Sequence, residues 1–477
     1  MPEIHELTAS ELRLAYGQGE LSPVEVTRTL LDRIEALNPC LRAFITVCAD
    51  EAMHAARYAE AALRRTDPDR TPPLFGIPVS IKDLVDVAGL PTTMGSLVAS
   101  REPAARDELF VEALRASGAI ILGKTNTSEF GLAAQTINRL GEPCRNPWNL
   151  ERTAGGSSGG AAAACAAGLG PIHHGTDGGG SVRVPAAYCG VVGLKPTGRR
   201  IPRWTRGVGM SQISTDGVLA RSVEDAALML YVMADPDRRD PTALRNTAHS
   251  FIHDAEVTKL DGLRIAWTTT LAGPTPSEPA VAAHVQNAAS VLASAGAILT
   301  ETSPEIPNPL DIFPTLSAVG AAANYGDLVE GREDELSDYT RSSLRRGRAL
   351  TGIEVAEAYA RLDLLQRTMA AWFEQYDALL MPTSAITAHP HGARIDEIAG
   401  EPVNPWMISI LYTPLANLIQ APAIAIPAGL DGSGLPTSVQ IMTRPGDEAT
   451  ALHCAALLEA EMPWAERYSS SMSVTGA

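Results

Sequence analysis

Residues 155–197, GGSSGGAAAACAAGLGPIHHGTDGGGSVRVPAAYCGVVGLKPT, carry the most distinctive pattern in this chain. The segment opens with two adjacent serines between two pairs of glycines. The spacing Gly155-x-Ser157-x-Gly159 matches the nucleophile elbow of serine hydrolases. The plain alternative is a flexible turn ahead of a helix over residues 161–167. The first question is whether Ser157 attacks a substrate or has another role.

A second glycine-rich turn, Gly178-Gly179-Gly180-Ser181, follows in the same segment. Consecutive glycines can direct several backbone N–H groups to one point, as an oxyanion hole beside a nucleophile requires. Asp177 and Arg183 flank the turn with opposite charges, and we expect them to pair and stiffen it. The alternative, a bare tight turn, does not explain the serine at its end.

Upstream, the segment GIPVSIKDLVDV (residues 76–87) contains a lysine within an apolar strand pattern. Strand alternation places Ser80 and Lys82 on one face. Taken alone, such a lysine more often lies at a solvated strand edge than in a catalytic site.

Composition narrows the class of protein. The 477 residues are 45% hydrophobic and long enough to bury a large core, which indicates a globular chain. The 55 acidic residues exceed the 38 basic ones and give a net charge of −17, which disfavours nucleic acid and anionic membrane surfaces as partners. No leader or membrane-spanning pattern is found, so we expect a cytoplasmic protein without membrane contact.

The cysteines and histidines give no metal-binding pattern. Six cysteines lack C-x-x-C spacing, and we expect them to be reduced. The pair His173-His174 has no further ligands at a useful spacing, so packing is the favoured interpretation. We expect neither a metal nor another cofactor.

Residues 118–125, GAIILGKT, satisfy the P-loop expression G-x-x-x-x-G-K-[ST]. A phosphate-binding loop must turn at its middle residues, whereas Ala-Ile-Ile-Leu favours a buried strand. We therefore interpret the match as accidental.

Strand and helix patterns alternate along most of the chain. Residues 263–267, 279–295 and 297–300 form a predicted βαβ unit. A helix-rich stretch covers residues 310–375, and strand patterns return near residues 378 and 423. The pattern predicts an α/β fold with a mixed or parallel sheet.

These segments together closely resemble the amidase signature family of serine hydrolases. The resemblance rests on residues 155–197, on the Lys82 segment, and on GKTNTSEFG, RNPW, LARSVEDAALML, DALLMPTS and GLPTSVQIM, in order along nearly the whole chain. It implies a single domain over residues 1–477 with a large mixed, mostly parallel central sheet covered by helices on both faces. It further implies an N-terminal helical arm, about residues 1–70, and a variable, helix-rich substrate-side region, about residues 305–415.

The family uses a Ser–cis-Ser–Lys triad, and the resemblance carries it over by position. Ser181 matches the nucleophile, Ser157 the bridging serine in a cis peptide, and Lys82 the base. The backbone amides of Gly178, Gly179, Gly180 and Ser181 match the oxyanion hole. Ser158, Asp177 and Arg183 are expected to support the site.

Two further positions are expected to bind substrate. Gly131 resembles a family position that lines the acyl site, and Gln135 closes the same loop. Departures from the family pattern occur at Cys165 and His173, which are expected to alter packing, and at Gly178, where a glycine is expected to widen the approach to Ser181.

The leading hypothesis is an amidase that hydrolyses linear C–N bonds next to a carbonyl, through an acyl-enzyme on Ser181. Carboxamides come first, then aryl amides, esters and carbamates. One alternative is a glutaminase-type component of a tRNA-dependent amidotransferase, which needs a partner protein. Another is an α/β-hydrolase-type esterase that uses Ser157 with His389 or His391. The expected partner is a small amide substrate, with a homodimer as the expected assembly.

Overall fold

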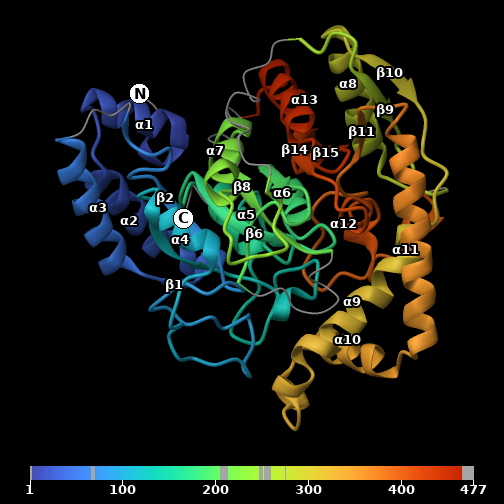
Figure 1. Ribbon diagram of the computed structural model, residues 1–477, viewed down its shortest axis with the longest axis horizontal. Coiled ribbons are helices and arrows are strands. Elements are labelled where there is room, and N and C mark those ends of the chain that lie inside the picture. The colour runs from blue at the N-terminus through green and yellow to red at the C-terminus, as the bar shows by residue number, and fades with distance from the viewer. Residues whose placement is uncertain are drawn as a thin grey trace.

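The computed structural model describes residues 3–65, 70–204, 213–245, 251, 259–273 and 275–464. An eleven-stranded sheet runs through its centre, flanked by helices (Figure 1). In order across the sheet, the strands are β1 (Phe44–Val47), β3 (Ile120–Thr125), β2 (Pro78–Lys82), β6 (Ile172–Asp177), β8 (Thr215–Ala220), β7 (Val192–Lys195), β14 (Ala423–Leu430), β15 (Pro436–Thr443), β11 (Ala378–Pro382), β9 (Arg264–Trp267) and β10 (Ile298–Glu301).

Within the described residues, thirteen α-helices accompany the sheet. They are α1 (Ala9–Gln18), α2 (Pro23–Leu41), α3 (Ala49–Leu63), α4 (Leu109–Ala116), α5 (Gly159–Ala166), α6 (Arg183–Cys189), α7 (Val223–Met233), α8 (Pro279–Ser294), α9 (Pro309–Tyr325), α10 (Asp338–Ala349), α11 (Gly352–Trp372), α12 (Pro414–Leu418) and α13 (Glu448–Glu461). Helices α4, α7, α13 and α8 contact one another in series, whereas α5 and α6 contact each other and the central strands.

The sheet is mixed, but the expectation that it is mostly parallel is wrong. Of the ten neighbouring strand pairs in the described sheet, six are antiparallel. Strand β8 inserts antiparallel between β6 and β7, which α6 connects. Strands β14 and β15 are joined by a short turn and therefore form a hairpin. The predicted βαβ unit is confirmed, because β9 and β10 pair in parallel.

The N-terminal region is tied to the sheet. Helices α1 to α3 lie at one end of the molecule (Figure 1), but the strand that follows α2, β1, pairs antiparallel with β3 at the sheet edge. The segment expected to be a helical arm therefore also contributes a strand. At the other end, α9 packs against α10 and α11, within the segment expected to be helix-rich.

The P-loop-like segment is a strand, as expected. Strand β3 continues through Gly123, Lys124 and Thr125 with an irregularity in its pairing to β2, and its residues are buried. Lys124 Nζ lies 2.9 Å from Asp83 Oδ1 in a fully buried ion pair. The lysine therefore fixes the loop after β2 and does not face a phosphate site.

Helix α5 positions the serine pair of the opening segment. All eight of its residues are buried, and Ala161 to Ala164 are completely inaccessible. A helix with small, apolar side chains on every side can lie within the core.

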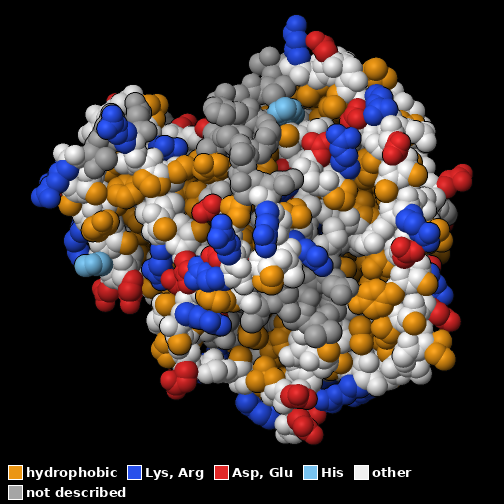
Figure 2. Space-filling view, in the orientation of Figure 1, with side chains coloured by type: hydrophobic (Ala, Val, Ile, Leu, Met, Phe, Trp, Pro, Cys, Tyr) orange, Lys and Arg blue, Asp and Glu red, His pale blue; other side chains and the backbone are white. Residues whose placement is uncertain are grey.

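On the face of the molecule shown in Figure 2, acidic and basic side chains are scattered among apolar ones.

Candidate active site

A cavity of about 410 Å³ opens beside the glycine-rich turn. It is lined mainly by small and apolar residues, and both Ser157 and Ser181 reach it. The lining residues are Leu84, Phe130, Gly131, Leu132, Ala133, Ala134, Ser157, Thr176, Gly178, Gly179, Ser181, Arg203, Ser214, Phe313, Ser317, Asn324, Tyr325 and Ile410. Helix α9 supplies four of them.

Lys82 lies at the end of β2, inside the sheet, with no exposed surface. Its Nζ lies 2.6 Å from Ser157 Oγ, 2.8 Å from Ser158 Oγ and 2.8 Å from Thr176 Oγ1. The solvated strand-edge alternative is therefore wrong.

The electrostatic surroundings of Lys82 favour its neutral form. Burial lowers the pKa of Lys82 well below its ordinary value, while the carboxylates of Asp177 and Asp216 act in the opposite direction. A neutral lysine amine has a lone pair that can accept a proton.

The hydroxyl protons around Lys82 can be partly assigned. Ser158 Oγ donates to the carbonyl of Thr176 at 3.2 Å, so its lone pair accepts a hydrogen bond from Lys82. Of the three hydroxyls on Nζ, those of Ser157 and Thr176 also line the cavity. Ser157 makes the shortest contact and is therefore the natural proton donor to the lysine.

The bend at the serine pair requires glycine. The Gly156–Ser157 peptide is cis, in agreement with the resemblance. A Cβ atom on Gly156 would lie 2.6 Å from the backbone of Gln135. Gly155 has a φ of +78° and would clash with Pro185 if it carried a side chain. The glycines are thus explained by close packing and not by flexibility.

The GGGS turn is held by the expected Asp177–Arg183 pair. Arg183 Nε and Nη2 donate to the two Asp177 oxygens at 3.0 Å each, and both side chains are fully buried. Burial alone would raise the pKa of Asp177, but the charge and hydrogen bonds of Arg183 outweigh it and hold that pKa well below its ordinary value. Asp177 therefore remains ionised.

One backbone amide expected in the oxyanion hole is committed elsewhere. Gly180 N donates to Asp177 Oδ1 at 2.7 Å, and Gly180 does not line the cavity. Among the hydrogen bonds of the described residues, none uses the amides of Gly178, Gly179 or Ser181, which do line it. The expected set of four amides is thus reduced to three.

Distant residues complete the support of this turn. Thr413 Oγ1 donates to the Gly179 carbonyl at 2.6 Å, and Asn417 Nδ2 donates to the Asp177 carbonyl at 2.9 Å. Gln440 accepts from Arg183 Nη1 at 2.8 Å. These three residues could not be found from the sequence, since they lie more than 200 positions away with no local signal. Thr176 was also missed, although the motif GTDGGGS contains it.

Ser181 lines the same cavity as Ser157 and Thr176 of the lysine cluster. Ser158 N donates to the Ser181 carbonyl at 3.1 Å, which ties the two serine segments together. Within the described residues, no hydrogen bond joins the Ser157 and Ser181 hydroxyls. Hydrogen bonds of catalytic groups often tighten only when a substrate is bound.

Of the two residues expected to bind substrate, one lines the cavity and the other does not. Gly131 lines the cavity, and a Cβ atom there would lie 3.5 Å from Ser157 Oγ. Gln135 is not among the residues that line the cavity, and its backbone packs against Gly156. A role of Gln135 in substrate binding stays a prediction.

The α/β-hydrolase alternative is not supported by the geometry. The strand before Ser157, β5 (Asn149–Thr153), belongs to a separate two-stranded sheet with β4 (Arg145–Asn146). His389 Nδ1 lies against the Pro390 carbonyl at 3.1 Å, whereas Ser157 Oγ is bonded to Lys82.

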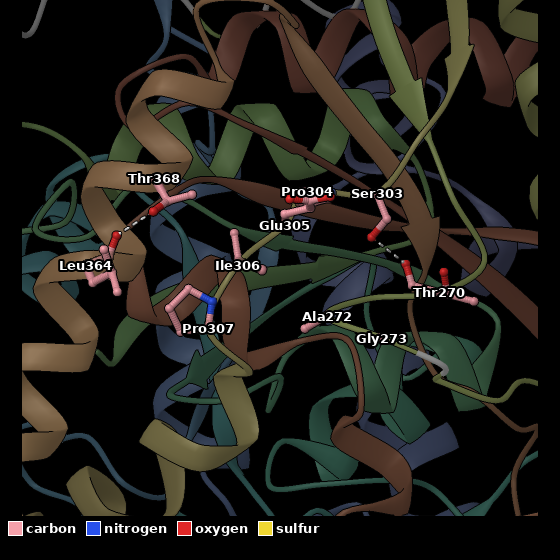
Figure 3. Close-up of a pocket in the computed structure, with 10 residues that line it drawn as sticks. All are labelled: Thr270, Ala272, Gly273, Ser303, Pro304, Glu305, Ile306, Pro307, Leu364 and Thr368. Atoms are coloured by element: carbon pink, nitrogen blue, oxygen red, sulfur yellow. Dashed lines mark hydrogen bonds between the residues drawn. The ribbon is translucent and has the colours of Figure 1, made fainter.

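A second cavity, of about 570 Å³, lies between the loops around Thr270 and Ser303 and one side of α11 (Figure 3). Two of its polar side chains are engaged locally: Ser303 Oγ donates to the Thr270 carbonyl, and Thr368 Oγ1 donates to the Leu364 carbonyl. None of the described residues that line it belongs to the lysine cluster or the GGGS turn. The chemistry is concentrated in the first cavity.

The sheet and the buried lysine–serine contact together point to the class of amide hydrolases, and comparisons with known proteins agree. Residues 25–452 match the Amidase family profile. An acylamidase of Rhodococcus erythropolis is 36% identical over 97% of this chain and 97% of its own. The chain belongs to the amidase family, and it is a hydrolase of C–N bonds in amides.

One further relative and two solved structures are also similar to this chain. A glutamyl-tRNA(Gln) amidotransferase component from Roseiflexus sp. (strain RS-1) is 36% identical over 98% of this chain and 99% of its own. The structure of a bacterial aryl acylamidase of the amidase signature family has a TM-score of 0.91 at 28% identity, with 98% of both chains covered. A 6-aminohexanoate cyclic dimer hydrolase has a TM-score of 0.88 at 29% identity, covering 98% of this chain and 99% of that one.

The described residues lack two further features. None of the helices there is long and apolar enough to cross a membrane. No group of three or more His, Cys, Asp or Glu side chains in the same part of the chain is arranged to hold a metal ion.

Proposed function

We propose that the chain hydrolyses neutral acylamides through a covalent intermediate on Ser181, with Lys82 as the base and Ser157 as the proton relay. The observation that carries the proposal is the 2.6 Å contact between buried Lys82 Nζ and Ser157 Oγ, beside a cavity that Ser181 also lines. Lysine suits this role because burial favours its neutral amine.

Ser181 Oγ attacks the amide carbonyl carbon while its proton passes to Ser157 and the Ser157 proton passes to Lys82 Nζ. The amides of Gly178, Gly179 and Ser181 donate to the resulting oxyanion. The C–N bond then breaks, and the departing amine takes a proton from Lys82 through Ser157. Water repeats the sequence on the ester and releases the acid.

The cavity lining supports an aryl or otherwise apolar substrate. The rings of Phe130 and Tyr325 stack with centroids 4.4 Å apart, and Phe313 packs against Gly179. Aromatic walls bind flat apolar groups through burial and ring contacts. Gly131 and Gly178 both line the cavity, and neither has a side chain that narrows it. The names of the acylamidase and the aryl acylamidase relatives agree with this substrate class.

The amidotransferase alternative is less favoured. Glutamine carries a carboxylate and an ammonium group, which need charged partners in the cavity. Of the described residues that line the cavity, Arg203 has the only charged side chain, and its Nε already lies 3.2 Å from Asp216 Oδ2.

A substrate panel tests the proposal. We expect turnover of neutral chromogenic anilides, and loss of that turnover in Ser181→Ala while the circular dichroism spectrum is unchanged. Undiminished anilide turnover in Ser181→Ala contradicts the proposal. Glutaminase activity that depends on an added partner protein, without anilide turnover, supports the alternative.

For the setting of the enzyme, we propose the cytoplasm and a homodimer that acts without nucleic acid. The net charge of −17 disfavours polyanions, and the six cysteines are free thiols, five of them buried. Light scattering of the purified enzyme, with and without nucleic acid, measures both the assembly and the partner.

A further inference from the structure

A buried histidine lies directly behind Lys82 on the neighbouring strand β6. The Lys82 backbone N–H donates to His174 Nδ1 at 3.3 Å, so this nitrogen carries no proton. The opposite ring nitrogen, Nε2, donates to Asp216 Oδ1 on β8 at 3.0 Å. The exposed fractions of the His174 and Asp216 side chains are 0% and 1%.

Asp216 in turn connects this histidine to the cavity wall. Its Oδ2 lies 3.2 Å from Arg203 Nε, and Arg203 lines the same cavity as Ser181. The Arg203 side chain is 21% exposed, so the ion pair has one member in the core and the other at the wall. A continuous polar path therefore leads from the substrate cavity to the backbone of Lys82.

We propose that Arg203, Asp216 and His174 are positioning residues that set the charge state of Lys82 from the wall of the substrate cavity. The inference rests on the proposed role of Lys82 as the base. Asp216 is a buried negative charge that favours protonated lysine, and Arg203 offsets it. His174 holds both partners in place, since one ring nitrogen accepts from Lys82 and the other donates to Asp216.

His174, expected from the sequence only to pack, has a polar role here. Burial lowers its pKa, while the hydrogen bond and charge of Asp216 act in the opposite direction. The neutral ring, with its proton on Nε2, fits both hydrogen bonds. His174 therefore acts as a fixed polar connector and need not change its protonation state.

Other charged or titratable groups face the two ends of this path. Asp177 faces Lys82 from the end of β6, but its charge is offset by Arg183. The groups that face Arg203 are Glu108 before α4, Asp86 after β2 and Tyr325 on α9. Arg203 is thus a cation that lies close to several acids on this side of the lysine, and its removal should leave more negative charge there.

Charge-changing variants separate this role from a purely structural one. Asp216→Asn keeps the acceptor for His174 but removes the charge. We expect it to move the acid limb of the kcat/KM profile for a neutral anilide to lower pH, by roughly half a unit or more. Arg203→Met should move the same limb to higher pH by a similar amount, and the double variant should return toward the wild-type profile.

A buried ion pair elsewhere provides the control. Arg200 Nη2 lies 2.9 Å from Glu448 Oε2, and both side chains are almost completely buried. Glu448→Gln removes a buried charge of the same kind, and we expect the acid limb to stay at its wild-type position whatever the change in stability. If Arg203→Met does not fold, Asp216→Asn alone decides, because an unmoved or raised acid limb overturns the inference.

The pH dependence of Ser181 labelling by a fluorophosphonate gives a readout that needs no substrate. We expect Asp216→Asn to move the pH dependence of the labelling rate to lower pH, and Arg203→Met to move it to higher pH. If Lys82→Met is labelled as fast as wild type, the proposed function itself fails. If Lys82→Met is labelled slowly but Asp216→Asn and Arg203→Met move in one direction, or not at all, only the further inference is overturned.

Discussion

At the scale of single residues, the site depends on one lysine whose amine is surrounded by hydroxyls. Lys82 Nζ contacts Ser157, Ser158 and Thr176, and no solvent reaches it. Because Ser158 uses its own proton on a backbone carbonyl, the two adjacent serines are not equivalent.

This asymmetry predicts different results for the two serines. Ser157→Ala removes the proposed relay and should lower kcat/KM by about 10³-fold or more. Ser158→Ala removes one hydrogen bond to the lysine and should cost about tenfold. Steady-state kinetics on one anilide measures both. Equal losses in the two variants would contradict the relay role of Ser157.

The lysine and both serines were predictable because they stand in long motifs. The hydrogen-bond partner of each backbone amide was not predictable. Nothing in the letters GGGS indicates that the Gly180 amide is donated to Asp177. This hydrogen bond depends on the orientation of the Asp177 carboxylate, three residues earlier. Arg183 and Asn417 hold that carboxylate by donating to it.

At the scale of elements, the GGGS turn packs closely against α9. A Cβ atom on Gly179 would lie 2.4 Å from Phe313 Cζ of α9. The turn and α9 are far apart in sequence, so this packing across the fold limits where the turn and its backbone amides can lie.

We therefore predict that Gly179→Ala displaces these amides and lowers kcat/KM by about 10²-fold or more. Phe313→Leu, added to Gly179→Ala, should restore part of this loss by making room for the new methyl group. Kinetics of the two single variants and the double variant measure the coupling. Wild-type turnover in Gly179→Ala would show that the turn is not held where the structure has it.

Element types were largely predictable, but strand direction was not. The apolar strand patterns and the helical spacing of the sequence locate four strands and one helix to within a few residues: β2, β3, β9, β10 and α8. They carry no information on β8, which enters between β6 and β7 from the other direction. Pairing depends on contacts between distant segments, which local patterns do not report. The mostly parallel expectation came from the family resemblance and not from the strand patterns.

At the scale of the whole molecule, one buried carboxylate ties the N-terminal helices to the centre. Asp225 on α7 accepts the backbone amides of Ala9 and Ser10 at 2.8 and 3.2 Å. Burial raises the pKa of Asp225 to about 7, although the two amide hydrogen bonds lower it. The folded state therefore holds this proton more tightly than the unfolded chain does.

The sign of the effect on stability follows from proton linkage. Between pH about 4 and about 7, the folded state binds the extra proton, so Asp225 makes the fold less stable as the pH rises, by at most about 1.4 kcal/mol per pH unit. Asp225→Asn should thus match wild type near pH 4 and gain relative stability toward pH 7.

Urea unfolding at several pH values measures this difference. Asp32→Asn is the control, since it makes the same change at an exposed position of α2 in the N-terminal region. A difference between Asp225→Asn and wild type that does not change with pH would contradict the linkage.

The central claim is that Ser181, and not Ser157, forms the covalent bond. A fluorophosphonate adduct located by mass spectrometry tests it directly. Trypsin leaves both serines on one peptide, residues 153–183, so cleavage before Asp177 is needed to separate them. We expect the added mass on the fragment that contains Ser181 and a loss of labelling in Ser181→Ala. An adduct on Ser157 would contradict the account.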